Sequence, residues 1–309
     1  MVLTKLRGWR GLVKTRAAGP GVNARALGLL AVAQLAIGAA AIFARFALTA
    51  AGPLSVSALR MAIAAIPVVA LAAFRGRYAR YDEPTERRLG LAGLALAVHF
   101  GSWIASLQHA SVAVSTLLVC STPVFTEAWS LMRTRRVRPA VLAGIVLALA
   151  GVAIVAGTPS RSETTLGIAL ALCGAIAMGA YLQLVRASDP RYTTLAVVGR
   201  TYPVAAIVLG ASALVTHAGV PDVAATAAWG GIFAMALISQ LFGHTAINAA
   251  VRVLSATFVA LTTLLEPLIA AIAAAFVFGE RPAPFTAAGA GLILIAIALA
   301  IRAEAQSTL

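Results

Sequence analysis

The stretch that decides the fold runs from residue 261 to residue 282 and reads LTTLLEPLIAAIAAAFVFGERP. It is long and apolar enough to cross a bilayer core, which is roughly 30 Å thick and takes about 20 helical residues. Glu266 and Pro267 nevertheless stand in its middle. In an apolar interior the carboxylate loses its hydration, and the proline costs about 3 kcal/mol because a backbone hydrogen bond is lost. We therefore expect a functional reason for this pair.

Composition places the chain in a membrane. Of its 309 residues, 61% are hydrophobic and 11% are charged, whereas about a quarter of the residues in soluble domains are charged. Ten apolar runs of spanning length lie at 26–48, 54–74, 89–107, 110–131, 139–157, 166–185, 193–215, 226–248, 253–278 and 284–302. They lack the period of two that is typical of barrel strands. The sequence predicts an all-α membrane protein with one transmembrane helix for each run.

The basic residues fall on one side of the predicted spans. A net charge of +14 is compatible with a nucleic-acid partner until the positions of the charges are considered. If the N-terminus is cytoplasmic, nineteen Lys and Arg residues lie in inner segments, and only Arg161 and Arg281 lie in outer loops. The positive-inside rule then predicts an inner (plasma) membrane protein with both termini in the cytoplasm. The basic excess sets the topology and does not indicate a nucleic-acid partner.

The N-terminal segment, residues 1–25, is basic and contains no acid. It is either a short helix on the anionic inner leaflet or a disordered tail. No apolar stretch in it has the length of a cleavable signal, so we expect the first span to act as an uncleaved anchor. Cys120 and Cys173 lie singly in separate spans, so we expect no disulfide, metal or cofactor.

The two halves of the chain resemble each other. FGSWIAS at 100–106 parallels FGHTAIN at 242–248, and ASVAVSTLLVCSTP at 110–123 parallels LSATFVALTTLLEP at 254–267. SALR, which ends at Arg60, likewise matches VVGR, which ends at Arg200. Each half holds five predicted spans, an odd number, so the second half should enter the membrane upside down. The sequence predicts two inverted five-helix repeats, at 26–157 and 166–302, which is a transporter architecture.

The end of the second repeat carries a family resemblance. LLEPLIAAIAAAFVFGERP followed by AAGAGLILIAIALA resembles the ending of the EamA-type ten-helix permeases of the drug/metabolite transporter superfamily. The resemblance covers about 27–302, although the first half has LMRTRRVRP in place of the Gly-Glu-Arg turn. It implies export of amino acids and other small metabolites, and the YddG-type amino-acid exporters are the first branch for comparison.

Polar residues inside the spans form two stripes. One lies on the third span and the other on its repeat partner, the eighth, at helical spacing. The stripes consist of His99, Ser102, Trp103 and Ser106 on the third span, and of Gln240, His244 and Asn248 on the eighth. We expect both to line a central cavity and bind substrate, with Gln34 of the first span as a weaker candidate. The alternative is that these residues only form hydrogen bonds between helices.

Glu266 is the deepest acid and admits two interpretations. Either it faces a wet cavity, or it forms a buried ion pair with Arg60 or Arg200. Pro267 should leave the carbonyl of Thr263 without a partner, and Pro123 should do the same to Val119 in the fourth span. Freed carbonyls are tolerated beside water, so the matched prolines predict cavity walls or hinges that take part in gating. A packing kink satisfied by nearby threonine side chains is the alternative.

Together these features predict a permease that exports a small zwitterionic metabolite, most simply an amino acid, by alternating access. Neutral polar groups and aromatic surface suit such a substrate, and the arginines would meet its carboxylate. The expected partners are the small-molecule substrate and the lipid bilayer, and the chain is expected to be a monomer or a weak homo-oligomer. Export of cationic drugs or other metabolites, an intramembrane enzyme, and a receptor remain the alternatives. Proton coupling stays open.

The predicted topology can be tested by cysteine labelling in intact cells. We expect Arg161→Cys and Gly219→Cys to react with an impermeant thiol reagent from outside. Asp82→Cys and Arg136→Cys should react only after the membrane is permeabilised, because the basic loops face the cytoplasm. Labelling of position 136 from outside would contradict the topology with a cytoplasmic N-terminus.

Overall fold

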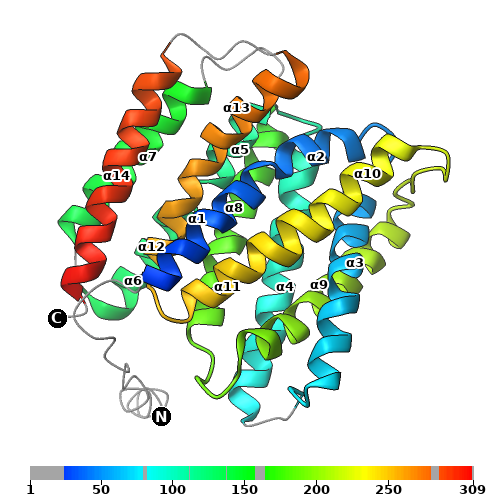
Figure 1. The fold of residues 1–309 in the computed structure, drawn as a ribbon, viewed down its shortest axis with the longest axis horizontal. Helices are drawn as coiled ribbons and strands as arrows, with labels where there is room; N and C mark the ends of the chain where they lie inside the picture. The colour runs from blue at the N-terminus through cyan, green and yellow to red at the C-terminus, as the bar shows by residue number, and fades with distance from the viewer. Residues whose placement is uncertain are drawn as a thin grey trace.

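The computed structural model describes residues 24–78, 82–110, 112–136, 138–156, 164–279 and 285–307, and all the regular structure in them is helical (Figure 1). Nearly all of the N-terminal segment 1–25 lies outside these residues, so its two interpretations stay predictions. Among the described residues, eight helices are long and apolar enough to cross a membrane. The other two predicted spans are a shorter apolar helix and a broken one, so the count of ten spans stays a prediction.

Six of the predicted spans are single helices in the structure. They are α3 (Pro53–Phe74), α4 (Glu83–Ser106), α7 (Pro139–Ala156), α8 (Thr165–Arg186), α9 (Thr194–Val215) and α14 (Thr286–Ser307). Helix α4 begins six residues before its predicted start at 89, because the Asp82 carboxylate caps it by accepting from the Thr85 backbone N–H at 2.8 Å. The first turn of this helix is polar, so the apolar pattern of the sequence did not indicate where the helix begins.

The other four predicted spans are interrupted. They are α1 (Ala24–Gly38) with α2 (Ala40–Ala47), α5 (Val112–Val119) with α6 (Thr122–Thr134), α10 (Thr226–Ala234) with η2 (Met235–His244) and α11 (Thr245–Val251), and α12 (Ala256–Thr262) with η3 (Thr263–Leu265) and α13 (Glu266–Phe278). Segment η2 is a π-helix and η3 is a single 3₁₀ turn. These four are the first and fourth predicted spans of the first repeat and the third and fourth of the second.

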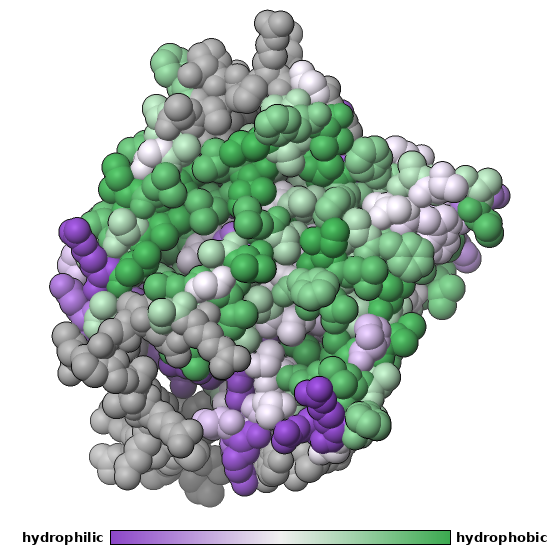
Figure 2. All heavy atoms as spheres, in the orientation of Figure 1, coloured by the Kyte–Doolittle hydropathy of each residue, from purple (hydrophilic) through white to green (hydrophobic). Residues whose placement is uncertain are grey.

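The outer surface of the bundle is suited to lipid. Large apolar side chains such as Ile66, Ile207 and Phe276 are exposed on three different helices. Figure 2 shows apolar side chains over the middle of one face and hydrophilic ones gathered toward its lower end. In water such a surface would be costly, whereas hydrocarbon accepts it, so the exposed apolar side chains define the membrane-facing band.

The packing of the helices repeats when the two halves are exchanged. Helix α3 packs along α9, and α7 packs along α14, so each of these pairs joins the same element of both repeats. Helix α4 of the first repeat packs along α8, and the matching second-repeat elements α10, η2 and α11 pack along α1 and α2. In the α7–α14 pair a Cβ on Gly151 would lie 2.6 Å from the Gly289 carbonyl oxygen, so glycine permits the close approach. This pattern supports the predicted two-fold relation between the repeats.

Charged groups tie the halves together at one end of the bundle. The Arg200 guanidinium on α9 contacts the Glu86 carboxylate on α4 at 2.9 Å, and the Tyr192 hydroxyl donates to the same carboxylate at 2.7 Å. The predicted alternative of an ion pair between Arg200 and Glu266 is therefore wrong. Arg200 lies near the end of its helix, where Glu86 can reach it, whereas Glu266 lies deep in another span.

A second charged group at this end joins α6, α12 and Arg138, the residue just before α7. The buried Glu127 carboxylate accepts hydrogen bonds from Arg138 and, at 3.2 Å, from the Thr257 hydroxyl. Glu127 and Arg138 belong to the first repeat and Thr257 to the second. At the opposite end, a neutral contact joins the halves, in which the Ser55 hydroxyl donates to the Ala218 carbonyl at 2.9 Å. The charged end is the one that the positive-inside rule assigns to the cytoplasm.

Candidate functional site

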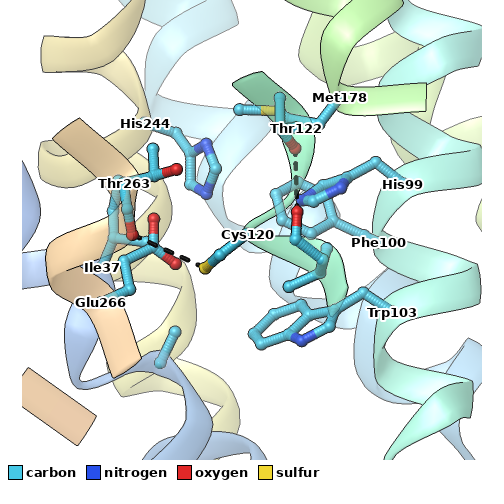
Figure 3. A pocket seen from close by; sticks show the side chains of 12 residues that line it. Ile37, His99, Phe100, Trp103, Cys120, Thr122, Met178, His244, Thr263 and Glu266 are labelled. Carbon is cyan, nitrogen blue, oxygen red and sulfur yellow. Dashed lines mark hydrogen bonds between the residues drawn. The ribbon is translucent and has the colours of Figure 1, made fainter. Parts of the chain in front are cut away.

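All four interrupted spans meet at one cavity in the centre of the bundle (Figure 3). Its lining includes Ile37 and Ala40 beside the α1–α2 break, Cys120 and Thr122 at the α5–α6 break, His244 at the end of η2, and Thr263 and Glu266 around η3. Continuous helices α4 and α8 complete the wall. Interrupted helices and π-helical segments are common at functional sites, because they present polar backbone and re-aimed side chains inside a membrane.

The two predicted prolines restart helices at this cavity. Pro123 lies in the first turn of α6, and Pro267 is the second residue of α13. In the first turn of a helix a missing N–H leaves no hydrogen bond unmade, so the expected cost of Pro267 is largely avoided. The same location places Glu266 at the N-terminus of α13, where the helix dipole favours a carboxylate.

The carbonyls that the prolines were expected to free have partners. The Thr263 carbonyl accepts from the Glu266 backbone N–H in the 3₁₀ turn and from the Cys120 thiol at 3.6 Å. The Val119 carbonyl accepts from the Thr122 hydroxyl at 2.9 Å. The expectation that both carbonyls lack partners is therefore wrong, because a turn and local side chains satisfy them.

His99 and His244 bring the two predicted stripes together. Their rings lie 6.4 Å apart at an angle of 61°, and the His99 ring stacks on Trp103 at 6.3 Å. His99 Nδ1 lies 2.9 Å from the Gly174 carbonyl oxygen, so Nδ1 carries the proton and Nε2 is left as an acceptor. The Trp103 indole N–H and His244 Nδ1 have no hydrogen-bond partner within the described chain. The cavity wall thus holds unpaired polar atoms beside aromatic surface.

Ser102, Ser106 and Asn248 of the stripes do not line the cavity. The Ser106 hydroxyl donates to the Trp103 carbonyl of its own helix at 2.6 Å. The Ser102 hydroxyl donates to the Val98 carbonyl of its own helix at 2.6 Å, on the side of α4 that faces Gly174. The Asn248 amide accepts a hydrogen bond from the Tyr181 hydroxyl at 2.7 Å and so joins α11 to α8. In this conformation these three residues make structural contacts of the kind that the alternative interpretation expects.

The two glutamines are also buried and partly paired. Gln34 Nε2 donates to the Thr262 hydroxyl at 3.1 Å, and its Oε1 is left without a partner. Gln240 Oε1 accepts from Arg60 at 2.9 Å, and its Nε2 is left without a partner. Neither glutamine lines the cavity, although each lies one turn from a residue that does.

Glu266 is a lining residue of the cavity. Its side chain is partly buried, and the described part of the chain offers it neither a hydrogen bond nor an ion pair. Arg60 contacts Gln240 instead, and Arg200 contacts Glu86. Of the two interpretations of this carboxylate, the cavity geometry supports the one in which it faces water or a ligand.

Several lining residues escaped the sequence reasoning. Phe100, Cys120 and Met178 contribute to the wall, and none of them is a polar residue at a stripe position. Phe100 directly follows His99 and belongs to the FGSWIAS motif, so the motif held a signal for it. Met178 had none, because an apolar residue in an apolar span is indistinguishable from a lipid-facing one.

The cavity is small in this conformation. It has about 30 Å³ of room for the centres of water molecules, which suffices for roughly two waters. A metabolite therefore needs the surrounding helices to move before it can bind. No group of three or more His, Cys, Asp or Glu residues suited to a metal ion occurs within the described ranges.

A repeated helical bundle with lipid-facing apolar sides and interrupted helices around a polar cavity defines a multi-pass membrane transporter. A family model described as the EamA-like transporter family matches residues 24–157 and 165–302, so the chain belongs to that family. The family resemblance seen in the sequence is thus confirmed. The family's members transport small molecules across membranes, and the two matched segments are two copies of the EamA repeat.

The fold is also found among solved structures. One of them, described only as "Crystal structure of protein", aligns with a TM-score of 0.76 at 19% sequence identity. The alignment covers 92% of this chain and 99% of the other. At this identity the likeness shows a shared fold alone. No curated protein matches the chain.

Substitutions on α4 test whether the cavity wall binds substrate. We expect His99→Ala and Trp103→Ala each to lower transport tenfold or more, which corresponds to about 1.4 kcal/mol, with folded protein retained. Ser102→Ala is the matched control, because this hydroxyl lies on the same helix and bonds only to its own helix backbone. Normal transport by both cavity variants would contradict the assignment.

Glu266→Gln tests the isolated carboxylate. The neutral isostere keeps the shape, so we expect wild-type melting with a changed transport rate or pH dependence. If Glu266 were half of a buried ion pair, its loss would strand a charge at about 3 to 5 kcal/mol, and the melting temperature would fall. In that case adding Arg60→Gln would restore stability. Wild-type melting together with wild-type transport at every pH would contradict both interpretations.

Proposed function

We propose that this protein exports a small zwitterionic metabolite, most simply an amino acid, across the bacterial inner membrane by alternating access. One observation carries the proposal: interrupted helices from both repeats converge on a single polar cavity in the centre of the bundle. Transport by alternating access requires a site that both halves share, so that their relative movement can open it to either side.

The chemistry of the cavity suits an amino acid. Unpaired donors and acceptors on Trp103, His244 and Glu266 can orient a small polar head group. Ile37, Phe100 and Met178 supply apolar wall for a side chain. Ligand sites of this kind combine mostly apolar surface with a few placed polar groups.

The contacts at the two ends support a state that is closed toward the cytoplasm. Glu127, Arg138 and Thr257 form the group that joins the repeats beside α6 and α12, and we call it the inner latch. Helices α6 and α12 belong to the two interrupted spans whose middles line the cavity. Opening toward the cytoplasm must separate these helices and break the hydrogen bond between Thr257 and Glu127.

A cationic substrate is the second candidate. The Glu266 carboxylate and the rings of Phe100 and Trp103 line the same cavity, and such a combination attracts cations. A metabolite or drug with an amine and no acid would use these groups alone. Counterflow with amines and amino acids in parallel separates the two candidates.

Counterflow in proteoliposomes tests the proposed function directly. Vesicles preloaded with one unlabelled compound should accumulate its labelled form, and the panel should include amino acids, amines, nucleosides and sugars. We expect amino acids to give accumulation above empty vesicles. Accumulation of amines alone would favour the second candidate, and no accumulation of any compound would contradict transport of these classes.

The inner latch gives a prediction about conformation. Cys120 lines the cavity and serves as a native reporter once the exposed Cys173 is replaced by serine. Thr257→Val removes the hydrogen bond to Glu127, so we expect faster labelling of Cys120 from the cytoplasmic side of inverted vesicles.

Thr216→Val is the control for this experiment, because Thr216 is exposed and bonds only to carbonyls of its own helix. It should leave the labelling rate unchanged. A Thr257→Val rate equal to that of the control would contradict a gating role for the latch.

A further inference from the structure

Arg60 is a fully buried cation without a buried anion in contact. Its guanidinium lies on α3, where Nη2 donates to Gln240 Oε1 at 2.9 Å and the carbon Cζ lies 4.0 Å from the centre of the Phe100 ring. Nε and Nη1 have no hydrogen-bond partner, and no carboxylate of the described residues lies within 4.0 Å. A buried charge without a partner of opposite sign destabilises the folded protein. A negatively charged group beside Arg60 would remove this cost.

The unpaired side-chain atoms of Arg60 and of its hydrogen-bond partner Gln240 are donors. Gln240 Nε2 has no partner either, because the amide is oriented by the bond from Arg60 to its oxygen. Three nitrogens of two touching side chains therefore lack acceptors. An ionised carboxylate is the complementary group, since it has about four acceptor positions and no donor.

A comparison of the two repeats shows that the second half lacks a carboxylate that the first half has. Arg200 corresponds to Arg60 in the two parallel motifs, and it has a resident carboxylate, Glu86. Glu86 lies 14 residues before Phe100, and Ala228 lies 14 residues before Phe242, at the matching place of the second half. Ala228 is buried and offers only a methyl group. One arginine has its own glutamate, whereas the second half has alanine at the position that corresponds to this glutamate.

This arginine lies directly behind the cavity wall. Phe100 lines the cavity, where Figure 3 shows it beside His99, and its ring is also the one that Arg60 stacks against. Gln240 and the lining residue His244 lie one turn apart on η2. A shift of the Phe100 side chain would therefore connect the donors of Arg60 and Gln240 to the cavity.

We propose that Arg60 and Gln240 form a carboxylate subsite for the transported metabolite, and that Phe100 covers this subsite when it is empty. The inference rests on the proposed function and restricts the class of substrate. The substrate has a carboxylate, and Arg60 is the residue that selects it. The carboxamide of the same compound would add donors to a site that already has too many, so it should bind much more weakly.

The first test measures ligand binding without transport. The melting temperature of the purified full chain is recorded with common L-amino acids, acetate and benzoate, and with the carboxamide of each. We expect at least one carboxylate to stabilise the wild type with an apparent affinity at least tenfold higher than that of its amide. Arg60→Gln should abolish the difference, and Arg45→Gln, an exposed arginine of α2, should preserve it.

The second test supplies the missing carboxylate within the chain. Gln240→Glu places an acid of the same shape beside Arg60, as Glu86 is placed beside Arg200. We expect this variant to melt at a higher temperature than the wild type and to lose the response to carboxylates. Arg60→Gln without ligand should also melt no lower than the wild type, because it removes an unpaired charge. A lower melting temperature for both variants would overturn the inference.

The remaining outcomes are equally decisive. Equal stabilisation by carboxylates and amides, or no stabilisation of the wild type by any carboxylate, would overturn the inference. If carboxylates stabilise only the Glu266→Gln variant, the occupant of the subsite is the Glu266 carboxylate and not a substrate. Counterflow without carboxylate selectivity would refute the subsite alone, and carboxylate binding without counterflow would refute the export function alone.

Discussion

Every backbone polar group inside a bilayer needs a partner within the protein, and the structure depends on how this constraint is met at four breaks in the helices. A continuous helix satisfies itself, so it can line a cavity only with side chains. At the α12–α13 junction the 3₁₀ turn and the Cys120 thiol satisfy the Thr263 carbonyl. Pro267 then begins a new helix where its missing N–H does no harm. The break thereby places Glu266 at a helix N-terminus facing the cavity, which is how a carboxylate is tolerated at this depth.

Some ionisable groups of the spans contact a group of opposite charge, and others do not. At the charged end, Arg200 and Arg138 have carboxylate partners, and the Arg200–Glu86 pair joins the two repeats. In the centre, Arg60 and Glu266 have opposite charges and do not contact each other. Groups that serve stability alone would pair. Charges kept apart around a cavity are a cost to the resting state, which a ligand or a conformational change can relieve.

Sequence patterns predicted the fold better than the site. Apolar length predicted the helices, because the bilayer imposes it on every spanning segment, and the resemblance of the motif LLEPLIAAIAAAFVFGERP predicted the family. The stripe on α4 predicted that His99 and Trp103 share the cavity, since this helix keeps the regular period. The stripe on the eighth span assumed the same period, but η2 is a π-helix, and Gln240 turns to Arg60 while His244 faces the cavity. Helix breaks and hydroxyl rotamers, such as that of Ser102, are set by tertiary packing and leave no periodic signal.

The differences between the repeats are more informative about function than their similarities. In the proposed alternating-access cycle, two equivalent halves suffice to build a bundle that opens to either side, and the matched motifs are consistent with that proposal. They do not account for the proposed selectivity, because a zwitterionic substrate has two unlike ends that need unlike partners. At matched positions the first half has Glu86 where the second has Ala228, and the second has His244 where the first has Ser102. In each case one repeat has an ionisable side chain at the position and the other repeat does not. The cavity lies where the two copies meet, and of these unmatched residues His244 is the one that lines it.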